Sequence, residues 1–278
     1  MACSATGVIF LPMTAKFALE SGSNVLTVAF VRALIAVAIL ALAALAVRQR
    51  LTLPLSLFWH GLAVGIAGAA FVYGMYGAIL TINISLALLI LFFYPMVVAT
   101  WEHLSGTTRL KPIQWFWGLV AVAGLSLIVG VKLEETSFVG ILLSLLAMLA
   151  SVVITLVNVR VAERTGSLVA NLHMSLWGVL IFGLGLLFFG SFVMPQTTLG
   201  QVGLIGNGFF YCLSWVAFFA GARILGATRA SMITLMEPPL AGFGAWLIFG
   251  ETFTPLQWLG FVVALGSLFL FERAARSK

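Results

Sequence analysis

Long apolar runs separated by short polar breaks dominate the pattern of the 278-residue chain. A helix that crosses a membrane needs about 20 mainly apolar residues, and each break is too short to form a soluble domain. The pattern therefore predicts an all-α polytopic membrane protein with ten transmembrane helices. The predicted helices cover residues 2–19, 24–47, 57–80, 84–103, 112–131, 137–158, 167–190, 199–222, 228–249 and 255–272.

The second half of the chain repeats features of the first half. A shift of 143 residues places Pro95 on Pro238, and places the motif P-x-Q-W at 112–115 on the same motif at 255–258. The order and near-constant spacing of such matches predict a duplicated unit of five helices, with one repeat over 1–133 and a second over 134–278. Because five is odd, the second repeat must enter the membrane inverted relative to the first.

Basic residues gather on one side of the predicted membrane. By the positive-inside rule, that side is the cytoplasm, and both termini lie there. The net charge of +6 is then a topology signal, and no nucleic-acid partner is needed to explain it. Eleven of the fourteen basic residues lie on this side: Arg48, Arg50, Arg109, Lys111, Arg160, Arg164, Arg223, Arg229, Arg273, Arg276 and Lys278.

Composition excludes several classes of protein. Only 8% of the residues are charged, whereas soluble domains carry about 25%. No zinc-protease, serine-hydrolase or nucleotide-binding motif is present, and the chain has no Asp, which excludes an intramembrane aspartyl protease. Cys3 and Cys212 form neither a disulfide framework nor a zinc motif. We therefore expect no enzyme activity, no metal and no cofactor.

Inverted repeats are a recurring design of secondary transporters, which bind their solutes near the bilayer midplane. The architecture therefore predicts a small-molecule solute as partner, beside the membrane lipid. A non-transporting, lipid-handling or channel-like membrane protein is the alternative from a different class.

Three stretches resemble a known family. The run GETFTPLQWLG at 250–260 is similar to the signature that closes each half of the drug/metabolite transporter superfamily, EamA type. FALE at 17–20 and AFVR at 29–32 resemble the end of its first helix and the start of its second. The run Met236-Glu237-Pro238 resembles the amino-acid exporter branch in particular. The first repeat departs from the pattern, because Gly106-Thr107-Thr108 stands where Gly-Glu is expected.

The resemblance covers essentially the whole chain as two tandem units. It implies export of small organic solutes, most of all aromatic or neutral amino acids, across a bacterial inner membrane by alternating access. It implies a central cavity lined mainly by the first, third, fourth, sixth, eighth and ninth helices. Other metabolites or cationic drugs are the alternative solutes, and protons are a candidate coupling ion.

Aromatic residues inside the predicted helices are candidate substrate-binding residues. Tyr and Trp are enriched at membrane interfaces, which is the simplest interpretation of any one of them. Tyr76, Tyr94, Tyr211 and Trp215, however, lie more than one turn from their helix ends. An aromatic, weakly polar cavity suits an amphipathic organic solute better than an ion.

Glu237 is the most unusual candidate for substrate binding. It lies in an apolar run near the predicted midplane, where carboxylates are costly and usually face a bundle interior or a wet cavity. One interpretation is structural: a protonated Glu237 donates a hydrogen bond to a carbonyl that the following prolines leave free. The other is functional: Glu237 binds the ammonium group of a solute or carries a proton. Tyr94 occupies the equivalent position of the first repeat.

Prolines inside helices remove a hydrogen bond and kink the axis. We therefore expect Pro12, Pro95, Pro238 and Pro239 to act as hinges during transport.

Two further local patterns carry structural expectations. Lys16 and Glu20 stand four residues apart and are expected to form a surface pair. Arg32, inside the second helix, is interpreted chiefly as a structural partner of Glu20, with snorkelling or a place along a solute path as alternatives. The pair Gly61 and Gly65 predicts close helix packing.

Overall fold

We analysed a computed structural model of the chain that describes all residues except 1, 131–136, 241–242, 244–252 and 277–278. The described residues form helices and no strands. The helices pack as two compact units, one made of residues 1–72 and 156–224 and the other of 73–155 and 225–278. Each unit therefore draws on both halves of the sequence, and the boundaries between the units fall within helices.

The first unit contains α1 (Ala2–Glu20), α2 (Val25–Ala46), the short 3-10 helix η1 (Leu55–Leu57), α8 (Ser167–Phe189) and nearly all of α9 (Thr198–Leu225). The second contains α4 (Ile84–Leu91), α5 (Tyr94–Leu104), α6 (Pro112–Val129), α10 (Ala227–Thr234) and α12 (Pro255–Arg276). Two helices, α3 (Phe58–Ile79) and α7 (Phe138–Thr165), are divided between the units.

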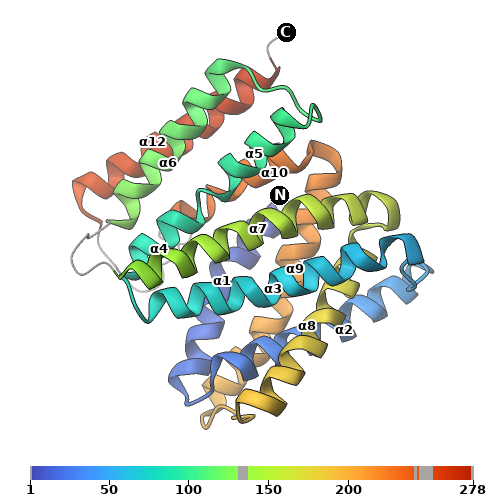
Figure 1. Cartoon of the computed structure of the whole chain (residues 1–278). Helices are drawn as coiled ribbons and strands as arrows, with labels where there is room; N and C mark the ends of the chain where they lie inside the picture. Colours follow the sequence, from blue (N-terminus) through green and yellow to red (C-terminus); the bar gives the residue numbers. More distant parts are fainter. Residues whose placement is uncertain (1, 131–136, 241–242, 244–252, 277–278) are drawn as a thin grey trace. The chain divides into compact units, whose positions relative to one another are not determined.

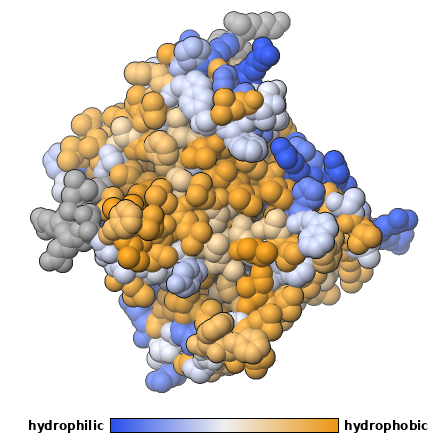
Figure 2. All heavy atoms as spheres, viewed as in Figure 1, coloured by the Kyte–Doolittle hydropathy of each residue, from blue (hydrophilic) through white to orange (hydrophobic). Residues whose placement is uncertain are grey.

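Eight helical segments within the described residues are long and apolar enough to cross a membrane. The first predicted segment, 2–19, coincides with α1, and the ninth, 228–249, lies partly outside the described residues. The face in Figure 2 is covered mainly by apolar side chains. Leu42 on α2 is 68% exposed and Val262 on α12 is 70% exposed, which suits a helical surface surrounded by lipid.

The repeated motif P-x-Q-W marks the start of two helices, α6 and α12. Pro112 and Pro255 occupy the first helical position, where a missing backbone N–H costs nothing. The side-chain oxygen of Gln114 accepts a hydrogen bond from the backbone N of Lys111 at 3.0 Å, and that of Gln257 accepts one from the backbone N of Thr254 at 2.9 Å. The motif P-x-Q-W therefore forms the same helix cap in both repeats.

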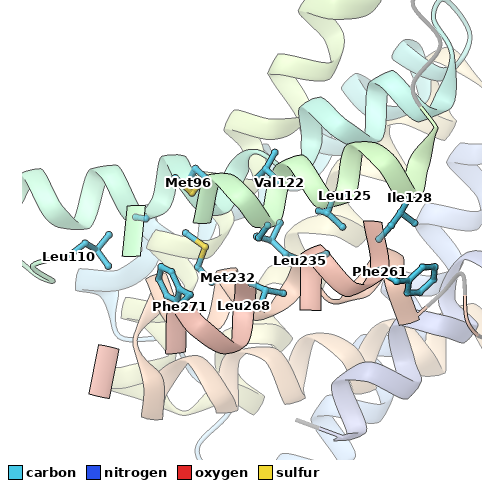
Figure 3. Close-up of a cluster of buried hydrophobic side chains, with 13 residues drawn as sticks. Met96, Leu110, Val122, Leu125, Ile128, Met232, Leu235, Phe261, Leu268 and Phe271 are labelled. Carbon is cyan, nitrogen blue, oxygen red and sulfur yellow. The ribbon is translucent and has the colours of Figure 1, made fainter. Parts of the chain in front are cut away.

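The core of the second unit lies where α6 packs along α12 (Figure 1). Leu125 and Ile128 of α6 meet Phe261 and Leu268 of α12, and Leu235 joins them (Figure 3). The two backbones approach closely because a glycine stands on each helix. A Cβ atom on Gly124 would lie 2.6 Å from the backbone N of Ala264, and one on Gly260 would lie 2.7 Å from the backbone O of Gly124.

Small residues also set the packing of the first unit, where α2 packs along α8. A Cβ atom on Gly61 would lie 3.3 Å from the Trp177 ring nitrogen. One on Gly203 of α9 would lie 2.8 Å from the backbone O of Thr14 on α1. The expectation of close packing at Gly61 and Gly65 is confirmed, because both contact Trp177.

Two helices that the sequence predicts as continuous are interrupted. In the first, α4 ends at Leu91 and α5 begins at Tyr94. In the second, α10 ends at Thr234 and the chain becomes helical again at Glu237. The shift of 143 residues maps the first interruption onto the second, with Leu91 on Thr234 and Tyr94 on Glu237. The duplication therefore extends to the position of a helix break.

The breaks change the setting of the predicted hinge prolines. Pro95 does not lie in the middle of a continuous helix. It lies in the first turn of α5, where proline is well tolerated. Pro238 and Pro239 follow Glu237 at the equivalent start. Pro12 lies within α1, but its side chain is outside the described part of the structure.

Candidate functional site

The breaks place Tyr94 and Glu237 at matching positions of the second unit, each as the first residue of a helical stretch. The hydroxyls of Tyr94 and Thr234 are 2.6 Å apart, and Thr234 Oγ1 lies 2.7 Å from the backbone O of Ser231. Since Thr234 has one proton, a consistent arrangement has Tyr94 donating to Thr234 and Thr234 donating to Ser231. The pair ties the start of α5 to the end of α10.

The Glu237 carboxyl lies within electrostatic reach of the Tyr94 hydroxyl. Glu237 is half-buried. Within the part of the chain that the structure describes, neither a hydrogen bond nor an ion pair engages this carboxyl. The hydrogen bond that the structural interpretation of Glu237 requires is therefore not formed there. Chemically, the carboxyl can hold a proton or attract a cation.

Tyr76, the third candidate of the second unit, lies on α3 and is half-buried. Its side chain forms no ring contact or hydrogen bond with the described residues. The structure therefore brings Tyr94 and Glu237 together, and it shows no contact that joins Tyr76 to them.

Tyr211 and Trp215, the two candidates of the first unit, lie one turn apart on α9 with their ring centroids 6.3 Å apart. The Trp215 ring stacks on Phe219 at 5.4 Å, and its backbone O accepts a hydrogen bond from Asn171 of α8 at 3.3 Å. The ring contacts pack both side chains along α9, and the hydrogen bond ties α9 to α8.

Arg32 of α2 lies over the Tyr211 ring, with its Cζ 4.9 Å from the ring centroid. The expected pairing of Arg32 with Glu20 is wrong. Glu20 pairs with Lys16 at 3.7 Å instead, in an exposed contact that confirms the local four-residue expectation. The Lys16 contact forms because both partners lie on the same face of one helix.

Glu102, a buried residue near the end of α5, holds a structural role that no sequence pattern indicated. One of its oxygens, Oε2, accepts hydrogen bonds from the backbone N of Thr228 at 3.0 Å and from the Thr228 hydroxyl at 2.6 Å. Thr228 lies in the first turn of α10, whose preceding residue Gly226 has a φ of 84° and offers no side-chain cap. A carboxylate at a helix N-terminus satisfies a free donor and complements the helix dipole.

The repeat explains why this contact is needed. In the first repeat, the equivalent backbone N of Ser85 donates to the side chain of Asn83 at 2.8 Å. Gly226 replaces that local cap in the second repeat, so Glu102 supplies the oxygen from a neighbouring helix. Because the two residues are 126 apart in sequence, no local pattern indicates the contact.

We expect Glu102→Ala to destabilise the protein by about 1–3 kcal/mol, because two buried donors on Thr228 lose their acceptor. Glu102→Gln keeps an acceptor oxygen and should cost clearly less. Thermal unfolding of the purified variants in detergent would measure both. Equal stability of the Ala and Gln variants would contradict the capping role.

An ion pair adds to the Glu102 contact at the same end of α10. The guanidinium of Arg229 bonds the carboxylate of Glu272 on α12 through two nitrogens, with Nε 3.0 Å from Oε1. Together with Glu102, it fixes the orientation of the helix that leads to Thr234.

No group of three or more His, Cys or Glu residues suited to a metal ion occurs in the described ranges.

Comparisons with known proteins agree with this architecture. The profile of a family described as "EamA-like transporter family" matches residues 1–130 and again residues 138–273. No curated protein matches the sequence. One crystal structure, described only as that of a protein, superposes with a TM-score of 0.82 and covers 99% of this chain and 98% of its own. At 16% sequence identity, that likeness shows a shared fold alone.

Proposed function

Because the chain belongs to the EamA-like transporter family, and is thus a multi-pass membrane transporter of small solutes, we propose that it exports aromatic and neutral amino acids by alternating access. The proposal places it in a bacterial inner membrane, with both termini in the cytoplasm. In this proposal, the protein comprises ten transmembrane helices in two inverted repeats, 1–133 and 134–278. Protons are the proposed coupling ion.

The observation that carries the proposal is the placement of Glu237 and Tyr94 at equivalent positions of the two helix breaks. Secondary transporters build solute and ion sites from interrupted helices near the midplane. A carboxyl there without a hydrogen-bond or ion-pair partner among the described residues is suited to the ammonium group of an amino acid or to a transported proton.

The aromatic candidates support the choice of solute. Tyr211 and Trp215 are held on α9 by ring contacts and by the hydrogen bond from Asn171. Aromatic side chains provide apolar contact area together with a few polar atoms, which suits an amphipathic amino acid. In this proposal they contact the side chain of the solute. Tyr76 and Tyr94 are the proposed aromatic substrate-binding residues of the second unit.

The hinge residues complete the proposed cycle. Pro95 and Pro238 stand in the first turns after the two breaks, so the chain can bend there without losing a helical hydrogen bond. Bending at the breaks would open the site to one side of the membrane at a time, with Pro12 and Pro239 as further hinge positions.

Uptake of a panel of labelled amino acids into liposomes containing the purified protein tests the proposal. We expect saturable uptake of aromatic and neutral amino acids, exceeding that of acidic ones, with protein-free liposomes as control. Saturable uptake of organic cations alone would transfer the proposal to the cationic-drug alternative. Equal leakage of all solutes would contradict it.

A further inference from the structure

A polar cluster lies within the apolar helices of the first unit. Arg32 is the eighth residue of α2, which begins at Val25, and is thus about 10 Å from the helix start at 1.5 Å per residue. Across from it, α9 contributes Tyr211 and α8 contributes Ser175. An arginine inside a membrane helix is costly, and such residues commonly mark solute pathways.

The positive charge of Arg32 has no carboxylate partner among the described residues. The ion pairs found there join Lys16 to Glu20 and Arg229 to Glu272. Arg32 instead contacts the face of the Tyr211 ring. That contact uses the guanidinium face and leaves its N–H donors, which lie in the guanidinium plane, available for other groups.

Buried polar atoms of α8 next to Tyr211 and Trp215 also retain hydrogen-bonding capacity. Ser175 is 1% exposed, and its hydroxyl faces the hydroxyl of Tyr211. It nevertheless forms no hydrogen bond of normal geometry, not even to its own helix, although serines inside helices commonly bond the carbonyl four residues earlier. The Oδ1 atom of Asn171, one turn earlier on α8 and 1% exposed, is likewise unbonded, and as an acceptor it can bind an N–H donor of a solute but not its carboxylate. Buried polar atoms of this kind are rare and call for a partner.

We infer that Arg32, Ser175 and Tyr211 form a subsite for the carboxylate of the transported solute. The planar guanidinium can bind a carboxylate through two parallel N–H donors, and the two hydroxyls can each donate one more hydrogen bond. This inference rests on the proposed function and narrows its solutes to those that carry a free carboxylate. The aromatic face of Trp215, next to Tyr211, provides an apolar surface for the solute side chain.

A lipid phosphate is the other anion that could reach an arginine in a membrane helix. The burial of Ser175 favours the solute, because a side chain that is 1% exposed is shielded from the surrounding lipid. The experiment below distinguishes the two sources, since a lipid-bound Arg32 would not discriminate between solutes.

The test compares phenylalanine with phenethylamine, which lacks only the carboxylate, as solutes for liposomes containing the full chain. Arg32→Gln should raise the half-saturation concentration for phenylalanine by about ten- to a hundredfold, and that for phenethylamine by less than about twofold. Arg32→Lys should be intermediate, because it keeps the charge and loses the two-pronged geometry. Lys16→Gln, which removes an exposed charge from the same unit, should change neither.

Ser175→Ala provides a second test that does not depend on the folding of the arginine variants. The fold should tolerate it, because the Ser175 hydroxyl forms no hydrogen bond of normal geometry. It should weaken phenylalanine transport by about tenfold and spare phenethylamine. Equal loss of both solutes, or no change in their ratio in Ser175→Ala and Arg32→Gln, would overturn the subsite.

If the wild-type protein transports neither solute, the proposed function fails. A binding measurement then tests the carboxylate subsite separately. In detergent, phenylalanine should then raise the unfolding temperature of the wild type more than phenethylamine does. Ser175→Ala should abolish that difference. The same shift from both solutes would overturn the subsite.

Discussion

Replacing Glu237 with Gln should abolish most transport of amino-bearing solutes while the protein still folds and inserts. Gln keeps the size of the side chain but can neither carry a negative charge nor exchange a proton. The half-buried carboxyl has no hydrogen-bond or ion-pair partner among the described residues, so the fold loses little. A charge-assisted contact with the solute would be lost, and we expect transport to fall by about tenfold or more.

The same variant should flatten the dependence of transport on pH between about pH 5 and pH 8. Initial uptake rates, normalised to the amount of folded protein, provide the measurement. Glu163→Gln is the matched control, because Glu163 is an exposed carboxylate at the end of α7. Wild-type rates across this pH range in Glu237→Gln would make the carboxylate structural and move the site to the aromatic residues.

Substituting Ala for Gly124 should cause a clear loss of stability in the second unit. The new Cβ would lie 2.6 Å from the backbone N and 3.0 Å from the Cα of Ala264, and backbone atoms of a packed helix cannot move aside cheaply. Forcing α6 and α12 apart also loosens the contacts of Leu125 and Leu268. We expect a cost of about 1–3 kcal/mol.

Gly266 provides the control on α12, because a Cβ there would meet nothing within 4 Å. Gly266→Ala should raise the free energy of unfolding by about 0.5–1 kcal/mol through helix propensity alone. Thermal unfolding in detergent should therefore show shifts of opposite sign. If both variants shift in the same direction by the same amount, the close approach at Gly124 does not control the packing of α6 on α12.

Features with a local cause could be predicted from the sequence. The pair Lys16 and Glu20 forms as expected because four residues bring two side chains to one helix face. The motif P-x-Q-W marks true helix starts at Pro112 and Pro255, because proline and a capping glutamine act within one turn. The repeat itself is also visible, since it requires only an ordered series of matches.

The helix breaks could be predicted only in part. The prolines at 95 and 238 indicate a disturbance, but proline is compatible both with a kink inside a helix and with the first turn of a new one. The structure has the second arrangement, with the interruption just before each proline. The sequence alone cannot distinguish a kink from a new helix start, because proline occurs in both settings.

Contacts between distant segments escaped the sequence analysis. Glu102 bonds Thr228, and Arg32 stacks on Tyr211 rather than pairing with Glu20. Each partner is chosen by helix packing, which no spacing within one element encodes. The chemical type of the residues was still informative, because charges inside apolar helices must find a partner or a function.

Counterflow tests the central claim, that the chain is a secondary transporter, most directly. Liposomes containing the protein are loaded with unlabelled phenylalanine, diluted, and given a trace of labelled phenylalanine outside. A carrier that alternates between two faces exchanges inner for outer solute, so we predict a transient accumulation of label inside that saturates with external concentration. Label that equilibrates without accumulation, at a rate linear in concentration, would contradict the account and favour a channel-like or lipid-handling protein.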